Sequence, residues 1–167
     1  LGVANHTYRG VASIGQGNSL SGTHWIVSSI EHQSVLECFV EIEKRGGKVT
    51  HIDPEESGVV RAEKVAHALR QETVLISIGW ANSEIGTIQP LKEIARVIRR
   101  FRRPVYFHTD ACQAPRFLPL GVEQLGVDLM TLNGAKLYGP KGVGCLYCRR
   151  GVNLTPLVYG GGQEAGR

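Results

Sequence analysis

Short apolar runs alternate with amphipathic stretches along most of this chain, and that alternation constrains the fold more than any other feature. The run 73–78 is rich in β-branched residues, which is typical of a strand buried on both faces. Further along, Leu91, Ile94 and Ile98 recur at helical spacing. Strands that alternate with helices predict an α/β protein with three layers, in which helices cover both faces of a mostly parallel sheet.

The same pattern gives boundaries for the elements. We expect strands at 25–28, 48–52, 73–78, 105–108, 127–131 and 143–147, and helices at 34–45, 61–71 and 90–101. Only a glycine-rich loop joins the last two strands, which is too short for a helical crossover, so we expect that pair to be antiparallel. The first seventeen residues are expected to belong to a preceding helix.

Composition excludes several classes of protein. The 167 residues amount to about one domain. Their 42% apolar and 20% charged residues are typical of a soluble globular protein rather than a disordered or fibrous one. No apolar run is long enough to span a membrane, and no secretory signal opens the chain. We therefore expect a cytoplasmic protein with reduced thiols and no membrane partner. The chain opens at Leu1 and carries no stop signal after Arg167, so we expect a piece of a longer polypeptide.

The net charge of +4 is unevenly distributed. Five arginines fall within eight residues, at positions 96, 99, 100, 102 and 103. Such a cluster suits nucleic acid or an acidic partner, but it also suits the negative end of a helix dipole. No aromatic residues interleave to stack on bases, so we favour the helix end and expect no direct nucleic-acid partner.

Cys145 and Cys148 have the spacing of a redox motif or of half a zinc site. They lie in an apolar run that predicts a strand, and residues three apart on a strand point to opposite faces. No second pair of ligands follows. We therefore favour a structural interpretation of these two thiols.

Polar residues follow four of the predicted parallel strands. In open α/β sheets, ligands bind beyond the carboxyl ends of such strands. Each residue alone has an ordinary interpretation, such as a helix-start histidine, a turn former or a solvated lysine. Together on one edge they predict a ligand site. The residues are Glu31, His32, Trp80, Asn82, Ser83, Asp110, Gln113, Asn133 and Lys136.

The glycine-rich stretch around Lys136 lacks the pattern of a nucleotide phosphate loop, because Pro140-Lys141-Gly142 follows Gly139 instead of Gly-Lys-[Ser/Thr]. No G-x-G-x-x-G follows the first strand, so a dinucleotide is poorly supported as well. A lysine, an aspartate and an imidazole on one edge suit pyridoxal 5'-phosphate. That cofactor bonds to a lysine and needs an acidic partner for its ring nitrogen.

Five segments, in order along the chain, carry a resemblance to a known family. They are 29–32, 81–90, 108–113, 136–142 and 160–164. Together they resemble the cysteine desulfurases of the class V aminotransferase family, over essentially the whole chain. The resemblance implies the large, cofactor-binding domain of a fold-type I pyridoxal-phosphate enzyme. That domain would take up residues 1–167, truncated at both ends and without the C-terminal small domain.

The resemblance also implies how the ring of the cofactor would be held. Lys136 would bond to pyridoxal phosphate and later move the Cα proton of the substrate. Asp110 would pair with the pyridinium nitrogen, and Gln113 would hydrogen-bond the ring hydroxyl. His32 would stack on the ring and assist proton transfers.

Two parts of the chain depart from the family pattern. The amide that usually contacts the cofactor falls at Ser83, with Asn82 beside it, so either residue could make the contact. The family's phosphate-binding Ser-x-His falls at Asn133 and Ala135. Asn133 can donate a hydrogen bond to the phosphate, whereas Ala135 cannot.

The implied reaction converts L-cysteine to L-alanine. Sulfur passes through an enzyme persulfide to an acceptor protein, for iron–sulfur cluster assembly or tRNA thiolation. In the family the nucleophilic cysteine lies beyond the segment that this chain matches, so we expect little desulfurase activity from the chain alone. The resemblance further implies a homodimer in the intact enzyme.

Two alternatives stay open. One is another class V aminotransferase or lyase that lacks the nucleophilic cysteine. The other is a non-catalytic scaffold that retained the fold, for which Ala135 argues. Lys136 and Asp110 argue against a scaffold, which needs neither.

Overall fold

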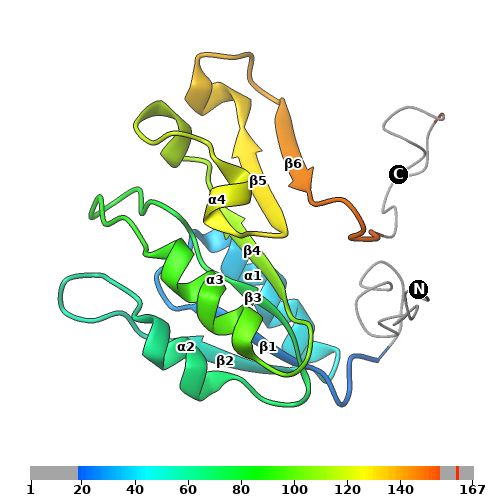
Figure 1. The fold of residues 1–167 in the computed structure, drawn as a ribbon. Helices are drawn as coiled ribbons and strands as arrows, with labels where there is room; N and C mark the ends of the chain where they lie inside the picture. Colours follow the sequence, from blue (N-terminus) through cyan, green and yellow to red (C-terminus); the bar gives the residue numbers. More distant parts are fainter. Residues whose placement is uncertain (1–18, 155–160, 162–167) are drawn as a thin grey trace, which may run out of the picture.

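The computed structural model describes residues 19–154 and 161, and its centre is a six-stranded sheet with the order β2-β1-β3-β4-β5-β6 (Figure 1). Neighbouring strands from β2 to β5 run parallel, and β6 runs antiparallel to β5. The predicted mostly parallel sheet and its antiparallel edge are therefore confirmed. The strands are β1 (His24–Ser28), β2 (Lys48–Ile52), β3 (Thr73–Ser77), β4 (Tyr106–Asp110), β5 (Leu129–Asn133) and β6 (Gly144–Cys148).

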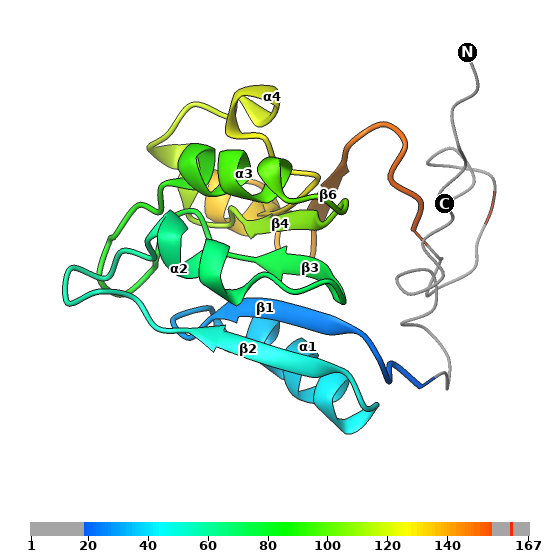
Figure 2. The same cartoon turned by 60° about the horizontal axis from the view of Figure 1, so that its bottom comes forward.

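Helices cover both faces of this sheet. Figure 2 shows α1 on one face and α2, α3 and α4 on the other, so the three predicted layers are present. No helix in the described part of the chain is long and apolar enough to cross a membrane. The helices are α1 (Gln33–Lys44), α2 (Ala62–Ala68), α3 (Leu91–Arg100) and α4 (Val122–Leu125), with 3-10 turns η1 (Ala114–Arg116) and η2 (Gly134–Leu137).

Side chains of the strands contribute to two hydrophobic clusters, one on each face of the sheet, because successive side chains of a strand point to opposite faces. Trp25 and Val27 of β1 pack with Phe39 and Ile42 of α1. Ile26, between them in sequence, belongs to the larger cluster on the other face. That larger cluster also contains Ile76, Ile94, Ile98, Phe107 and Met130. Both faces are therefore packed, and the ends of the strands are left to carry the polar chemistry.

Some boundaries differ from those expected. β4 reaches Asp110 instead of ending at residue 108, since the Trp80 N–H donates to the Asp110 carbonyl at 2.9 Å and prolongs the ladder. The helix expected at 61–71 ends at Ala68, because Leu69 adopts an extended backbone. The short α4 was not predicted. The helix expected in the first seventeen residues lies outside the part described.

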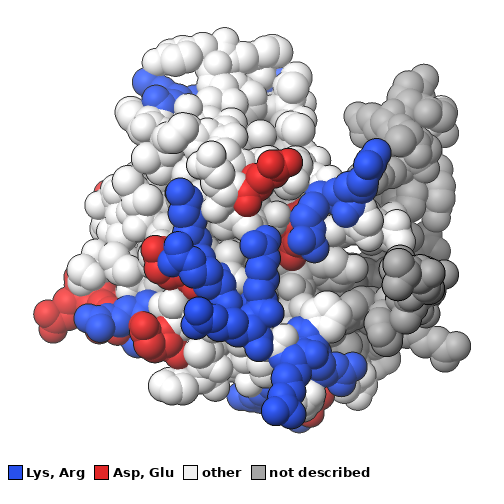
Figure 3. Space-filling view, viewed as in Figure 1, with Lys and Arg blue, Asp and Glu red and all other residues white. Residues whose placement is uncertain are grey.

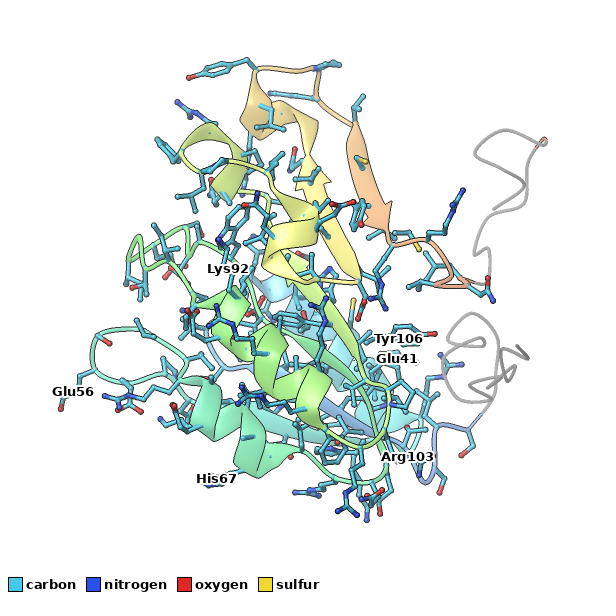
Figure 4. All side chains as sticks on the ribbon, viewed as in Figure 1. Glu41, Glu56, His67, Lys92, Arg103 and Tyr106 are labelled. Carbon is cyan, nitrogen blue, oxygen red and sulfur yellow. The ribbon has the colours of Figure 1, made fainter. Side chains whose placement is uncertain are left out.

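The clustered arginines lie at and just beyond the C-terminal end of α3, as the helix-end interpretation predicts. Figure 3 shows Lys and Arg side chains gathered over α3, and Figure 4 labels Lys92 and Arg103 at the two ends of this basic surface. Arg96 lies 3.8 Å from Glu93, and Arg99 donates to the Gly126 carbonyl at 3.2 Å. Arg96 thus contacts its own helix, and Arg99 contacts the turn after α4.

Cys145 and Cys148 lie on β6, as expected for a strand. Cys145 is exposed and Cys148 half-buried, which fits residues on opposite faces, and both are free thiols. Within the described residues, no three His, Cys, Asp or Glu side chains gather as metal ligands.

Candidate functional site

A cleft of about 610 Å³ opens beyond the carboxyl ends of the parallel strands. From β1 the chain goes first to β2 on one side and later to β3 on the other, so the strand order reverses there. Such a switch point is where open α/β sheets bind ligands. Trp80, which was predicted on this edge, is buried and does not line the cleft. Of the eight residues that the family resemblance assigns to the site, Ala135 is exposed and does not line it either. The other seven line it: His32, Asn82, Ser83, Asp110, Gln113, Asn133 and Lys136.

His32 is the N-cap of α1, in an extended backbone conformation. Its Nδ1 accepts a hydrogen bond from the Ser34 N–H at 3.2 Å and lies 2.8 Å from the Ser34 hydroxyl. In the neutral tautomer with an accepting Nδ1, the ring proton is on Nε2. His32 thus has both the ordinary helix-start function and a place on the wall of the cleft.

The side chain of Asn82 is hydrogen-bonded to backbone at both ends. Its Nδ2 donates to the Ile30 carbonyl at 3.0 Å, and its Oδ1 accepts from the N–H groups of Glu84 and Ile85 at 2.8 and 3.0 Å. These bonds join the loop after β3 to the turn after β1. The neighbouring Ser83 is exposed and also borders the cleft.

Asp110 is the last residue of β4, and its Oδ1 accepts from the Cys112 N–H at 2.9 Å. Burial is the main cause that raises the pKa of the Cys112 thiol to about 12, and the hydrogen bond and negative charge of Asp110 add to it. Cys112 is therefore a protonated, weakly reactive thiol at neutral pH.

The two short 3-10 turns carry the remaining site residues. Asn133 is the N-cap of η2, and its Oδ1 accepts from the Ala135 N–H at 3.0 Å. Lys136 is half-buried inside η2, and Gln113 precedes η1. The two turns are linked, because a guanidinium nitrogen of Arg116, the last residue of η1, donates to the hydroxyl of Tyr138, the residue after η2, at 2.6 Å.

Glu31 is the cleft residue whose importance the sequence did not reveal. Its position after β1 predicts a place on the edge of the sheet but indicates no function. In the structure its Oε1 accepts hydrogen bonds from the Ser28 hydroxyl at 2.5 Å and from the Gly79 N–H at 2.7 Å. The available signal was Gly79, two residues after the end of β3, since a glycine near a strand end permits close approach of another chain segment.

The polar side chains that line the cleft fit pyridoxal phosphate. Asp110 is paired with Thr131 across β4 and β5, and Lys136 follows β5 by three residues, so acid and amine border one space. The volume of the cleft falls within the range of about 300–1,000 Å³ that is usual for small-molecule sites. Asp110 is the acid available to a ring nitrogen, and Lys136 is the amine available to an aldehyde.

Fold and site together define a class, namely α/β proteins that hold a ligand at the switch point of a doubly wound sheet and offer it an acid and a lysine. The comparison with protein families makes this specific. The family model "Aminotransferase class-V" matches residues 10–165, so the chain belongs to the class V aminotransferase family. The predicted family is confirmed.

The curated relatives of this chain include cysteine desulfurases. It is 44% identical over 146 residues to "Cysteine desulfurase IscS" of Dictyoglomus turgidum, which covers 87% of this chain and 36% of that protein. It is 43% identical over 164 residues to "Cysteine desulfurase, mitochondrial" of Arthroderma benhamiae, which covers 97% of this chain and 32% of that protein. The chain thus spans well under half the length of the relatives it matches.

Solved structures agree in fold. The structure of SspA in complex with cysteine superposes with a TM-score of 0.82 at 42% identity, over 86% of this chain and 42% of that one. A NifS-like protein superposes with a TM-score of 0.83 at 38% identity, over 86% and 40% of the two chains. The α/β fold of a pyridoxal-phosphate enzyme of this family is therefore confirmed.

Proposed function

We propose that this chain forms the cofactor-binding part of a pyridoxal-phosphate-dependent cysteine desulfurase. That enzyme would convert L-cysteine to L-alanine and pass the sulfur, as an enzyme persulfide, to an acceptor protein for iron–sulfur cluster assembly or tRNA thiolation. The observation that carries the proposal is that Asp110 and Lys136 line one cleft at the switch point of the sheet. The desulfurases among its relatives supply the substrate class.

The cofactor, when bound, supplies an electron sink for the bond that is broken at the substrate Cα. Asp110 would keep a proton on the ring nitrogen through its carboxylate. Lys136 would bond to the aldehyde and afterwards hold or return the Cα proton at Nζ. The Nε2–H of His32 would face the ligand, because its Nδ1 is engaged by Ser34.

Hydrogen bonds within the protein help to decide which of the remaining site residues would contact the cofactor. The amide of Asn82 joins two backbone segments, so we propose that Ser83 contacts the cofactor and that Asn82 holds the loop. Gln113 would bond the ring hydroxyl. Asn133 would turn its Nδ2 toward the phosphate, because its Oδ1 caps η2.

Trapping the bound aldehyde tests the proposal. The chain is mixed with pyridoxal phosphate, reduced with borohydride, digested and mapped by mass spectrometry. We expect the pyridoxyl adduct on Lys136. The K136R variant should lose this adduct, whereas K141R, which changes an exposed lysine of the same loop, should keep it.

Equal labelling of Lys136 and Lys141 would contradict the proposal, because it would show only the general reactivity of exposed amines. Absence of any adduct on Lys136 would favour the non-catalytic scaffold. A mapped adduct on Lys136 without sulfur release from L-cysteine by the intact enzyme would favour another class V aminotransferase or lyase.

A further inference from the structure

Glu31 is a largely buried carboxyl at the cleft that the proposed chemistry does not use. Its two hydrogen bonds both end on Oε1, one from the Ser28 hydroxyl and one from the Gly79 N–H. Ser28 is the last residue of β1, and Gly79 follows β3 closely. A single carboxyl therefore ties the turn after β1 to the end of β3.

Gly79 makes this approach possible. A Cβ at position 79 would lie 3.1 Å from Oε2 and 3.4 Å from Oε1 of Glu31, so a side chain there would push the carboxyl away. Asn82 makes a second tie, from its Nδ2 to the Ile30 carbonyl at 3.0 Å. Both ties hold residues directly before His32. The place of that imidazole on the wall of the cleft therefore depends on Glu31.

The surroundings of Glu31 let its charge vary in the neutral range. Burial is the main cause that raises the pKa of its carboxyl to about 7, and the negative charge of Asp110 acts in the same direction. The hydrogen bonds from Ser28 and Gly79 act in the opposite direction. The other titratable side chains around the cleft are His32, Glu84, Asp110, Cys112 and Lys136.

We propose that Glu31 is a positioning residue of this site, which holds the turn before His32 against the end of β3. It also exchanges a proton with solvent, so that the charge near Asp110 changes while the turn stays in place. A protonated carboxyl still accepts the Gly79 N–H through its carbonyl oxygen. The tie therefore persists in both charge states. This inference deepens the proposed function. Only the third test below rests on that function, because it uses the cofactor as its probe.

The first test needs no cofactor and follows the backbone amide of Gly79 by NMR between pH 5 and 9. That N–H donates directly to the titrating carboxyl, so its chemical shift should move with a midpoint near pH 7. In E31Q the side chain is neutral at every pH, and the movement should disappear. A Gly79 signal that does not move in the wild type, or that moves equally in E31Q, overturns the proposal.

The second test compares melting temperatures at pH 7.5 and pH 5.0. The folded-state pKa of Glu31 lies above its ordinary value of 4.5, so the wild type gains stability as pH falls from 7 toward 4.5. We expect its Tm to rise relative to that of E31Q by about 5 °C or more. E56Q, at an exposed glutamate, should behave as the wild type. Equal pH dependence of wild type and E31Q contradicts the proton exchange.

The third test uses the pyridoxyl adduct on Lys136 as the probe of positioning. E31Q keeps an acceptor for the Gly79 N–H, so its adduct yield should stay within about twofold of the wild type. E31A loses the tie, and we expect a yield at least about tenfold lower together with shifted His32 ring signals. An E31A chain with unchanged His32 signals and yield contradicts the positioning function. If the wild type forms no adduct, the proposed function fails, while the first two tests still decide the inference.

Discussion

His108 bridges three strands of the sheet inside the protein. Its Nδ1 lies 2.8 Å from the Ser77 hydroxyl on β3, and its Nε2 lies 2.9 Å from the Thr131 hydroxyl on β5. Burial lowers the pKa of His108 to about 4, and the negative charge of Asp110 opposes this only in part. A neutral imidazole, which donates at one nitrogen and accepts at the other, is therefore built into the sheet. We predict that H108Q, which is neutral at every pH, flattens the acid side of the stability curve.

The size of the effect follows from linkage. The folded-state pKa of about 4 lies below the ordinary 6.5, so the unfolded chain takes up the proton first as pH falls. Stability contributed by the neutral imidazole is complete above pH 6.5 and is lost as pH falls toward 4. The full loss amounts to about 3 kcal/mol, because each pH unit between the two values is worth about 1.4 kcal/mol.

Urea unfolding at pH 7.0, 5.5 and 4.5 measures this directly. H108Q should be less stable than the wild type at pH 7.0, because glutamine does not reproduce both hydrogen bonds. The difference should shrink by about 2 kcal/mol at pH 4.5. H51Q, at an exposed histidine of β2, should follow the slope of the wild type. Parallel curves for wild type and H108Q would refute the reasoning, since His108 would then titrate alike in both states.

Two further predictions concern other buried groups. D128A should destabilise the chain by about 3 kcal/mol in urea unfolding, because the buried Asp128 accepts the Phe107 N–H at 2.8 Å, whereas D53A at an exposed site should change little. With iodoacetamide at pH 8, the exposed Cys38 should react on the order of 100-fold faster than Cys112, whose pKa is raised to about 12. Equal rates of labelling would show that Cys112 is accessible and ionised.

The sheet was predictable because local patterns dictate it. The run 73–78 is rich in β-branched residues, which is typical of a strand covered on both sides, and residues 73–77 form β3 in the interior of the sheet. The antiparallel edge followed from loop length alone, since the loop between β5 and β6 leaves no room for a helical crossover to a parallel strand. Both inferences depend on chain geometry rather than on long-range contacts.

Boundaries were harder where long-range bonds decide them. Asp110 was expected in a loop, yet the Trp80 N–H holds its carbonyl and keeps it in β4. The four residues from Val122 to Leu125 are too few to show helical periodicity, so α4 gave no signal. Glu31 was placed at the correct edge of the sheet, but its bond to Gly79 joins residues 48 positions apart, and no local pattern specifies such a contact.

The polar residues of the cleft therefore have two different functions, which their hydrogen bonds within the chain distinguish. Some hold the turns in place, and others are available to a ligand. His32 at Nδ1, Asn82 at Oδ1 and Asn133 at Oδ1 satisfy backbone groups of the turns that carry them. The Nδ2 of Asn82 satisfies the Ile30 carbonyl of the turn after β1. These bonds hold the turns rigid, which is what a preorganised site requires. Ser83 and Lys136 border the same space, and their side chains have no such bond to backbone within residues 19–154. Ser83 and Lys136 therefore offer a ligand at this edge a hydroxyl and an amine, so S83A should weaken cofactor trapping without loosening the loop, whereas N82A should do both.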